Sequence, residues 1–144
     1  MRRMFLNGTA MRGQPDHHAV AGSTYLGPRR TAARYRFVAV RDSFPGLLPM
    51  AAGGASIDGE LYEMTEDTLF GTLMPEEPAE LELGTIQLDD GEIVNAMHLQ
   101  PDRLAHGDLV VDITAFGGWR AYQDHLADGA ELAEWLGRGS RRPT

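Results

Sequence analysis

The side chains best suited to acid/base chemistry are two adjacent glutamates, Glu76 and Glu77, in the segment MPEEPAELE. Prolines on both sides of this pair restrict the backbone and could hold one carboxylate over a cleft. A carboxyl group buried among apolar side chains has a raised pKa and can exchange protons near neutral pH. The competing interpretation is a hydrated acidic loop, and the spacing alone favours that interpretation.

The opening segment MFLNGTAMRG carries a second candidate feature. Its apolar run predicts a buried strand, and Asn7-Gly8 predicts a turn at the end of that strand. Such a turn of small residues exposes successive amide N–H groups, which can bind a carboxylate or an oxyanion. A plain Asn-Gly turn is the alternative. The predicted substrate-binding residues are Asn7, Gly8, Thr9, Ala10, Met11 and Arg12.

Metal and cofactor signals are missing from the sequence. His17 and His18 are adjacent, the other three histidines are scattered, and no HExxH or HxH spacing occurs. The chain has no cysteine, no lysine, no GxSxG and no P-loop motif. We therefore predict that neither a metal nor an organic cofactor takes part. Absence of cysteine also fits a cytoplasmic protein.

The charge pattern limits the partners that we expect. The net charge is −8 with a pI near 5.0, so a nucleic acid would be repelled by the average surface. No apolar run is long enough to cross a bilayer, and MRRMFL lacks the features of a signal peptide. All 13 basic residues are arginines, and several fall between Arg29 and Arg41, where a local anion patch is possible.

Hydrophobic patterning predicts short strands with few helices. RYRFVAVRD alternates and predicts a strand, followed by a turn at Pro45-Gly46 and a short return strand. Gly27-Pro28 should end an earlier strand, and Gly59 suggests a bulge. ELELGTIQL and EIVNAMHL predict a hairpin around DDG. Another strand is expected over residues 108–114.

Helices are expected in two regions. Thr65 is a suitable N-cap for a helix that Pro75 and Pro78 end. After a glycine pair, one amphipathic helix carries Trp119, and a separate short helix carries Trp135. Mostly antiparallel strands followed by helices predict an α+β fold with a curled sheet or small barrel.

Several strings resemble a known family. MFLNGTAMRG resembles the opening strand and glycine loop of the gamma-glutamylcyclotransferase-like superfamily. NGTAMRGQPDHHAV, RTAARYRFVAV, ELGTIQLDDGEIV and especially DITAFGGWRAY are similar to one branch, the C-terminal domains of allophanate hydrolases. The resemblance implies a small mixed, mostly antiparallel β-barrel flanked by helices. We expect that domain over residues 1–126, a C-terminal helix and loose tail over 127–144, and no amidase domain in the chain.

The resemblance also implies site residues. In the cyclotransferases one glutamate acts as acid and base while loop amides bind the substrate. Glu77 matches that glutamate best, with Glu76 second. In the allophanate branch a histidine after the loop belongs to the site, and His18 matches it better than His17.

Two hypotheses on function remain. One is an enzyme acting on a small carboxylated amide or urea, of gamma-glutamyl or allophanate type. The other is an accessory subunit that partners a separate amidase through Trp119 or Trp135, although core packing is the commoner role of a tryptophan. Convergence of Glu77 and His18 on a pocket beside Gly8 would favour the enzyme.

Overall fold

A curled, mixed β-sheet forms the body of the protein. The computed structural model describes the backbone of residues 1–140 and the side chains of residues 1–137. The strands are β1 (Arg2–Leu6), β2 (Thr24–Arg30), β3 (Tyr35–Val40), β4 (Phe44–Pro49), β5 (Asp58–Met64), β6 (Leu81–Gln87), β7 (Ile93–Leu99) and β8 (Val110–Asp112). Their order is β2-β5-β1-β7-β4-β3-β8, and β6 pairs with β7.

Short helical segments connect the strands, and one long helix follows the last strand. They are η1 (His17–Val20), α1 (Glu66–Thr68), η2 (Leu69–Leu73), α2 (Met74–Glu76), η3 (Pro101–Arg103), η4 (Thr114–Phe116) and α3 (Trp119–Ser140). As predicted, Thr65 caps α1, because its side chain accepts a hydrogen bond from the Thr68 amide at 3.1 Å. The helical stretch ends at Glu76, and the next residue is extended because a proline follows it.

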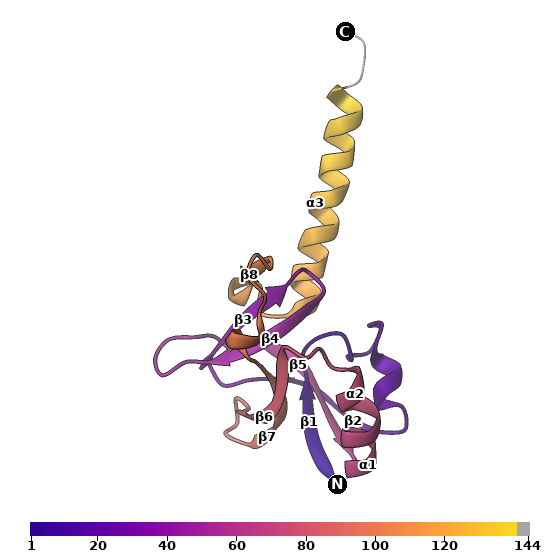
Figure 1. Cartoon of the computed structure of the whole chain (residues 1–144), viewed down its shortest axis with the longest axis vertical. Helices are drawn as coiled ribbons and strands as arrows, with labels where there is room; N and C mark the ends of the chain where they lie inside the picture. The colour runs from indigo at the N-terminus through magenta and orange to yellow at the C-terminus, as the bar shows by residue number, and fades with distance from the viewer. Residues whose placement is uncertain (141–144) are drawn as a thin grey trace.

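The curled sheet contains both parallel and antiparallel strand pairs. β7 pairs in parallel with β1 at Asn95 and with β4 at His98, whereas every other strand pair is antiparallel. The sheet forms a half-barrel around fully buried side chains such as Phe5, Phe37 and Leu47. The predicted α+β class with a mixed, mostly antiparallel sheet is confirmed (Figure 1).

The turn between β3 and β4 differs from the prediction. Pro45 and Gly46 lie inside β4, and the chain reverses at Arg41-Asp42, where φ is 51° and 53°. Two positive φ values form a turn whose twist matches the flanking strands. Gly46 is required for packing instead, since a Cβ there would lie 2.7 Å from the Leu99 Cβ.

The expected breaks at two other glycines also differ. β2 continues through Gly27 and Pro28 because it is an edge strand, where a missing N–H is tolerated. The register irregularity lies in β2 between Tyr25 and Gly27, so the bulge is not at Gly59. Gly59 instead permits close approach: a Cβ there would lie 2.4 Å from the Leu6 carbonyl oxygen.

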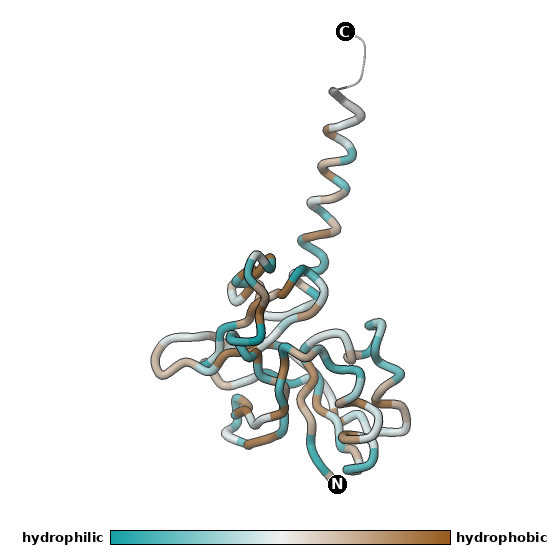
Figure 2. Tube along the Cα trace, viewed as in Figure 1, coloured by the Kyte–Doolittle hydropathy of each residue, from teal (hydrophilic) through white to brown (hydrophobic). Residues whose placement is uncertain are grey.

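One long helix replaces the two short helices that we predicted. α3 begins on the body, where Trp119 is 2% exposed, and then projects away from it (Figure 1). Hydrophobic and hydrophilic residues alternate along the projecting part (Figure 2). Trp135 lies there with 60% of its surface exposed. Residues 141–144 of the predicted tail lie outside the described residues. No helix in the described part of the chain could span a membrane.

Candidate functional site

A tight loop follows β1 and carries the predicted binding residues. The Met11 amide donates to the Gly8 carbonyl at 3.2 Å, and the Asp16 amide donates to the Thr9 carbonyl at 2.8 Å. A Cβ at Gly8 would lie 2.8 Å from the Pro45 ring, so β4 packs against the loop at a distance that only glycine allows. The amides of Gly8, Thr9 and Ala10 have no acceptor among the described residues.

Glu77 lies against this loop. A small cavity of about 20 Å³ is bordered by residues 5–10, Phe44, Pro45, Glu77, Leu81 and Met97. That volume is about the space of one water molecule. The side-chain nitrogen Nδ2 of Asn7 is buried without a hydrogen-bond partner among the described residues. The cavity therefore joins one carboxyl group, one unpartnered amide donor and the backbone of the loop.

Burial gives Glu77 an unusual proton affinity. Desolvation, and secondarily the nearby Asp16 carboxylate, raise the pKa of Glu77 from 4.5 to about 7. A carboxyl group with this pKa is present in both protonation states at neutral pH, so it can accept and then return a proton. Glu76, its neighbour, has an exposed side chain and does not border the cavity.

The two histidines lie at different places around the loop. The Nδ1 atom of His17 is 2.9 Å from the Ala10 carbonyl oxygen, so His17 packs on the loop. His18 is exposed: its Nδ1 lies 3.2 Å from the Pro15 carbonyl oxygen and its Nε2 lies 3.4 Å from the Glu76 carboxylate. The structure thus brings Glu77, but not His18, to the cavity beside Gly8.

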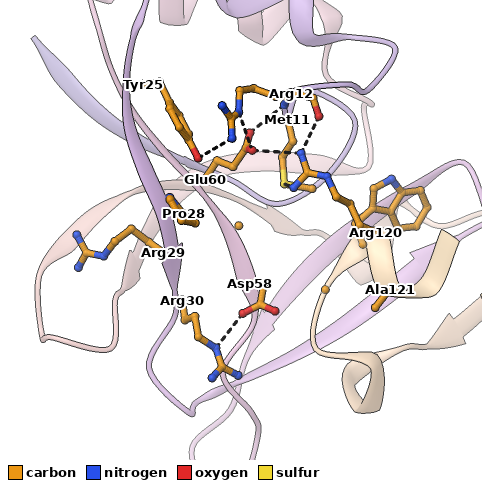
Figure 3. A pocket seen from close by; sticks show the side chains of 13 residues that line it. Met11, Arg12, Tyr25, Pro28, Arg29, Arg30, Asp58, Glu60, Arg120 and Ala121 are labelled. Carbon is orange, nitrogen blue, oxygen red and sulfur yellow. Dashed lines mark hydrogen bonds and ion pairs between the residues drawn. The ribbon is translucent and has the colours of Figure 1, made fainter. Parts of the chain in front are cut away.

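Met11 and Arg12 face a second, larger pocket. This pocket, which we call the arginine pocket, has a volume of about 810 Å³ and lies between the loop, β2, β5 and the start of α3 (Figure 3). Its residues are Met11, Arg12, Tyr25, Pro28, Arg29, Arg30, Asp58, Gly59, Glu60, Gly118, Trp119, Arg120 and Ala121. The six predicted binding residues are therefore divided between two cavities.

Glu60 is the centre of the charged network in the arginine pocket. It is 2% exposed and accepts hydrogen bonds from the Arg12 amide at 2.9 Å, the Tyr62 hydroxyl at 3.1 Å and Arg120 Nη2 at 3.1 Å. Burial by itself would raise the pKa of Glu60, but these donors outweigh it and the pKa is lowered. Glu60 is therefore a buried, ionised carboxylate.

The sequence analysis missed Glu60 and Arg120. One signal was available: Glu60 has the same strand phase as Tyr62 and Met64, both of which are buried. A carboxylate on a buried strand face requires a cationic partner. No spacing in the sequence indicates that this partner is Arg120, which is 60 residues away. In the described part of the chain, no group of three metal-ligating side chains comes together.

Comparison with known proteins shows the family. The profile of the allophanate hydrolase C-terminal domain matches residues 2–124. The chain belongs to this family. A urea amidolyase of Saccharomyces cerevisiae is 30% identical over 127 residues, which are 83% of this chain and 7% of that protein. The chain thus spans less than a tenth of the length of this relative.

Two further relatives support the superfamily. A uropathogenic E. coli-specific protein of known structure superposes with a TM-score of 0.77 at 32% identity, covering 86% of this chain and 96% of that one. A putative gamma-glutamylcyclotransferase of Drosophila melanogaster is 34% identical over 73 residues, 46% of each protein. The predicted membership of the gamma-glutamylcyclotransferase-like superfamily, in its allophanate hydrolase branch, is confirmed.

Proposed function

We propose that this family member is an enzyme that acts on a small carboxylated amide or urea at the loop cavity. The observation that carries the proposal is the contact of Glu77, with its raised pKa, and the free loop amides with one cavity. Glu77 removes a proton from the attacking nucleophile and returns it to the leaving nitrogen. The amides of Gly8 to Ala10 and the Asn7 side chain stabilise the oxyanion that forms in between.

The size of the cavity favours the smaller of the two substrate classes. A space of about 20 Å³ holds the reacting group alone, so the rest of any substrate must displace neighbouring side chains. An allophanate-type carboxylated urea requires less displacement than a gamma-glutamyl amide. For such a urea, water attacks the amide carbonyl, the C–N bond breaks, and the nitrogen leaves with the proton held by Glu77.

In this proposal, His18 helps to hold in place the segment that carries Glu77. Its Nε2 atom lies 3.4 Å from the Glu76 carboxylate, and Glu76 immediately precedes Glu77. A contact between η1 and the end of α2 therefore fixes the carboxylate next in the chain. We assign His18 a positioning role and Glu77 the proton transfer.

A product assay with purified protein tests the proposal. Allophanate is offered beside gamma-glutamyl amines, and ammonia, carbon dioxide and 5-oxoproline are measured. Ammonia or carbon dioxide that is lost in Glu77→Gln supports the urea reaction, and 5-oxoproline lost in that variant would assign the cyclotransferase reaction instead. Glu131→Gln is the matched control, because it removes an exposed carboxylate on α3 that does not border the cavity. Product that persists in Glu77→Gln refutes the assignment of Glu77.

The exposed end of α3 favours a second candidate function, an accessory subunit for a separate amidase. Leu132, Trp135 and Leu136 are 53–60% exposed and recur at the spacing of one helix face. The yeast relative carries this domain within a far longer urea amidolyase chain, which argues for an amidase as the partner. A purified amidase of the allophanate hydrolase type should bind the wild-type chain but not Trp135→Glu in size-exclusion chromatography. Failure of both proteins to bind would reject this function.

A further inference from the structure

We propose that the arginine pocket is a separate binding site for an organic monocarboxylate with an apolar body. Nothing in this proposal depends on the reaction at Glu77, which does not border the pocket. The argument rests on the number of charges, the free edges of two guanidinium groups and the apolar surface between them. These features lie close together in Figure 3.

The charge count leaves one positive charge without a partner. Arg30 is paired with Asp58 at 2.8 Å, and Arg29 is paired with three carboxylates, those of Asp90 at 2.8 Å, Glu92 at 3.8 Å and Asp89 at 3.9 Å. Arg12 and Arg120, in contrast, share the single carboxylate of Glu60, at 3.4 and 3.1 Å. Within the cluster of Arg12, Arg120 and Glu60, two guanidinium groups and one carboxylate leave a local net charge of +1. The net charge of the whole chain is −8, so this local positive charge contrasts with the average surface. It would attract one anionic group.

The two guanidinium groups are held in fixed positions before a ligand arrives. Arg12 stacks on Tyr25, with its Cζ 4.0 Å from the ring centroid, and its Nη2 donates to the Tyr25 hydroxyl at 3.1 Å. Arg120 Nη2 donates to the Arg12 carbonyl oxygen at 2.6 Å. Within the described residues, Nη1 of Arg12 and Nε of Arg120 have no hydrogen-bond partner. Free donors on fixed guanidinium groups suit a carboxylate, which two N–H groups can bind together.

Apolar surface continues from the guanidinium groups into the pocket. Pro28, Trp119 and Ala121 border the cavity beside Gly59 and Gly118. A volume of about 810 Å³ is in the range of pockets that bind small molecules with an apolar body and a few polar anchors. A small inorganic ion would leave most of this surface uncovered. The pocket therefore fits a carboxylate attached to an apolar chain or ring.

Binding of 3-phenylpropionate, compared with 3-phenylpropionamide, tests the proposal by amide NMR titration. The two probes have nearly the same shape, and only the acid carries a charge. We expect saturable shifts around Arg12, Gly59 and Arg120 with a millimolar or lower Kd for the acid, and at least about tenfold weaker binding of the amide. Equal binding of both probes, or absence of saturation with the acid, would overturn the proposal.

Three variants separate the site from effects on folding. Arg120→Gln should weaken binding of the acid at least about tenfold, because it removes the surplus charge. Ala121→Leu should abolish binding by filling the pocket, while every ion pair stays in place. Arg34→Gln is the matched control, since Arg34 is exposed and bonds to Gln87 elsewhere. Wild-type affinity in both Arg120→Gln and Ala121→Leu would refute the site, whereas unchanged binding in Glu77→Gln is expected.

Discussion

Replacing Glu77 by glutamine should stabilise the protein, and by more as the pH rises. Burial raises the pKa of Glu77 from 4.5 to about 7, so the folded state holds its proton where the unfolded state has lost it. A group with a raised pKa contributes full stability below its unfolded value, and this contribution falls as the pH rises through the folded value. Glutamine resembles the protonated carboxyl group and has no charge to bury.

The magnitude follows from the shift of the pKa. A shift from 4.5 to about 7 corresponds to about 3 kcal/mol of unfolding free energy once both states are fully ionised. Between about pH 5 and pH 8, the advantage of Glu77→Gln over the wild type should grow by about 2.5 kcal/mol. The other titrating groups contribute equally to both proteins, so they cancel in this difference.

Urea denaturation of both proteins at these two pH values measures the effect. Glu131→Gln is again the control, and we expect its difference from the wild type to be the same at both pH values because its side chain is exposed on α3. Two results would refute the reasoning: an advantage of Glu77→Gln that does not change with pH, or one that shrinks as the pH rises. Either would mean that the Glu77 carboxylate is hydrated in the folded protein.

Three further predictions concern stability, each measured by urea denaturation. Glu60→Gln should lower the free energy of unfolding by about 2 kcal/mol, because it removes the charged acceptor of four hydrogen bonds. A loss below about 0.5 kcal/mol would contradict the buried ion pair. Gly59→Ala should lower the free energy of unfolding by about 3 kcal/mol, because its Cβ would lie 2.4 Å from the Leu6 carbonyl oxygen. Gly71→Ala is the control: a Cβ there would meet nothing within 4 Å, so this substitution should be neutral or stabilising. Trp135→Glu should change stability by less than about 0.5 kcal/mol, and a larger loss would show that α3 folds back.

The sequence was sufficient for features that depend on neighbouring residues. The loop after β1, the cap at Thr65 and the DDG hairpin each arise from a few consecutive side chains, and all three are present. The meeting of Glu77 with the loop was predictable only through the family resemblance, because almost 70 residues separate them. Local patterns do not specify which strand ends meet.

Two local signals gave wrong predictions, and one contact between distant elements was missed. Pro45-Gly46 has turn-forming residues, but pairing of β4 with β3 carries them into a strand and moves the turn to Arg41-Asp42. Two separate helices were expected after the glycine pair, yet α3 continues through Gly129, since one glycine destabilises a helix by only about 1 kcal/mol. The Glu60–Arg120 contact links β5 to α3, and no spacing in the sequence predicts it.

Glu60 and Glu77 border two different cavities beside one loop, and their environments assign them opposite roles. Glu60 accepts four hydrogen bonds and its pKa is lowered, so its charge stabilises the fold and holds the Arg12 amide at the end of the loop. The Glu77 carboxylate has no hydrogen-bond partner among the described residues and its pKa is raised, so its charge destabilises the fold. A carboxylate retained at such a cost is typical of a functional group. Neutralising Glu60 should therefore lower stability, whereas neutralising Glu77 should raise stability and remove activity, and only this opposite pair of signs fits a structural carboxylate beside a catalytic one.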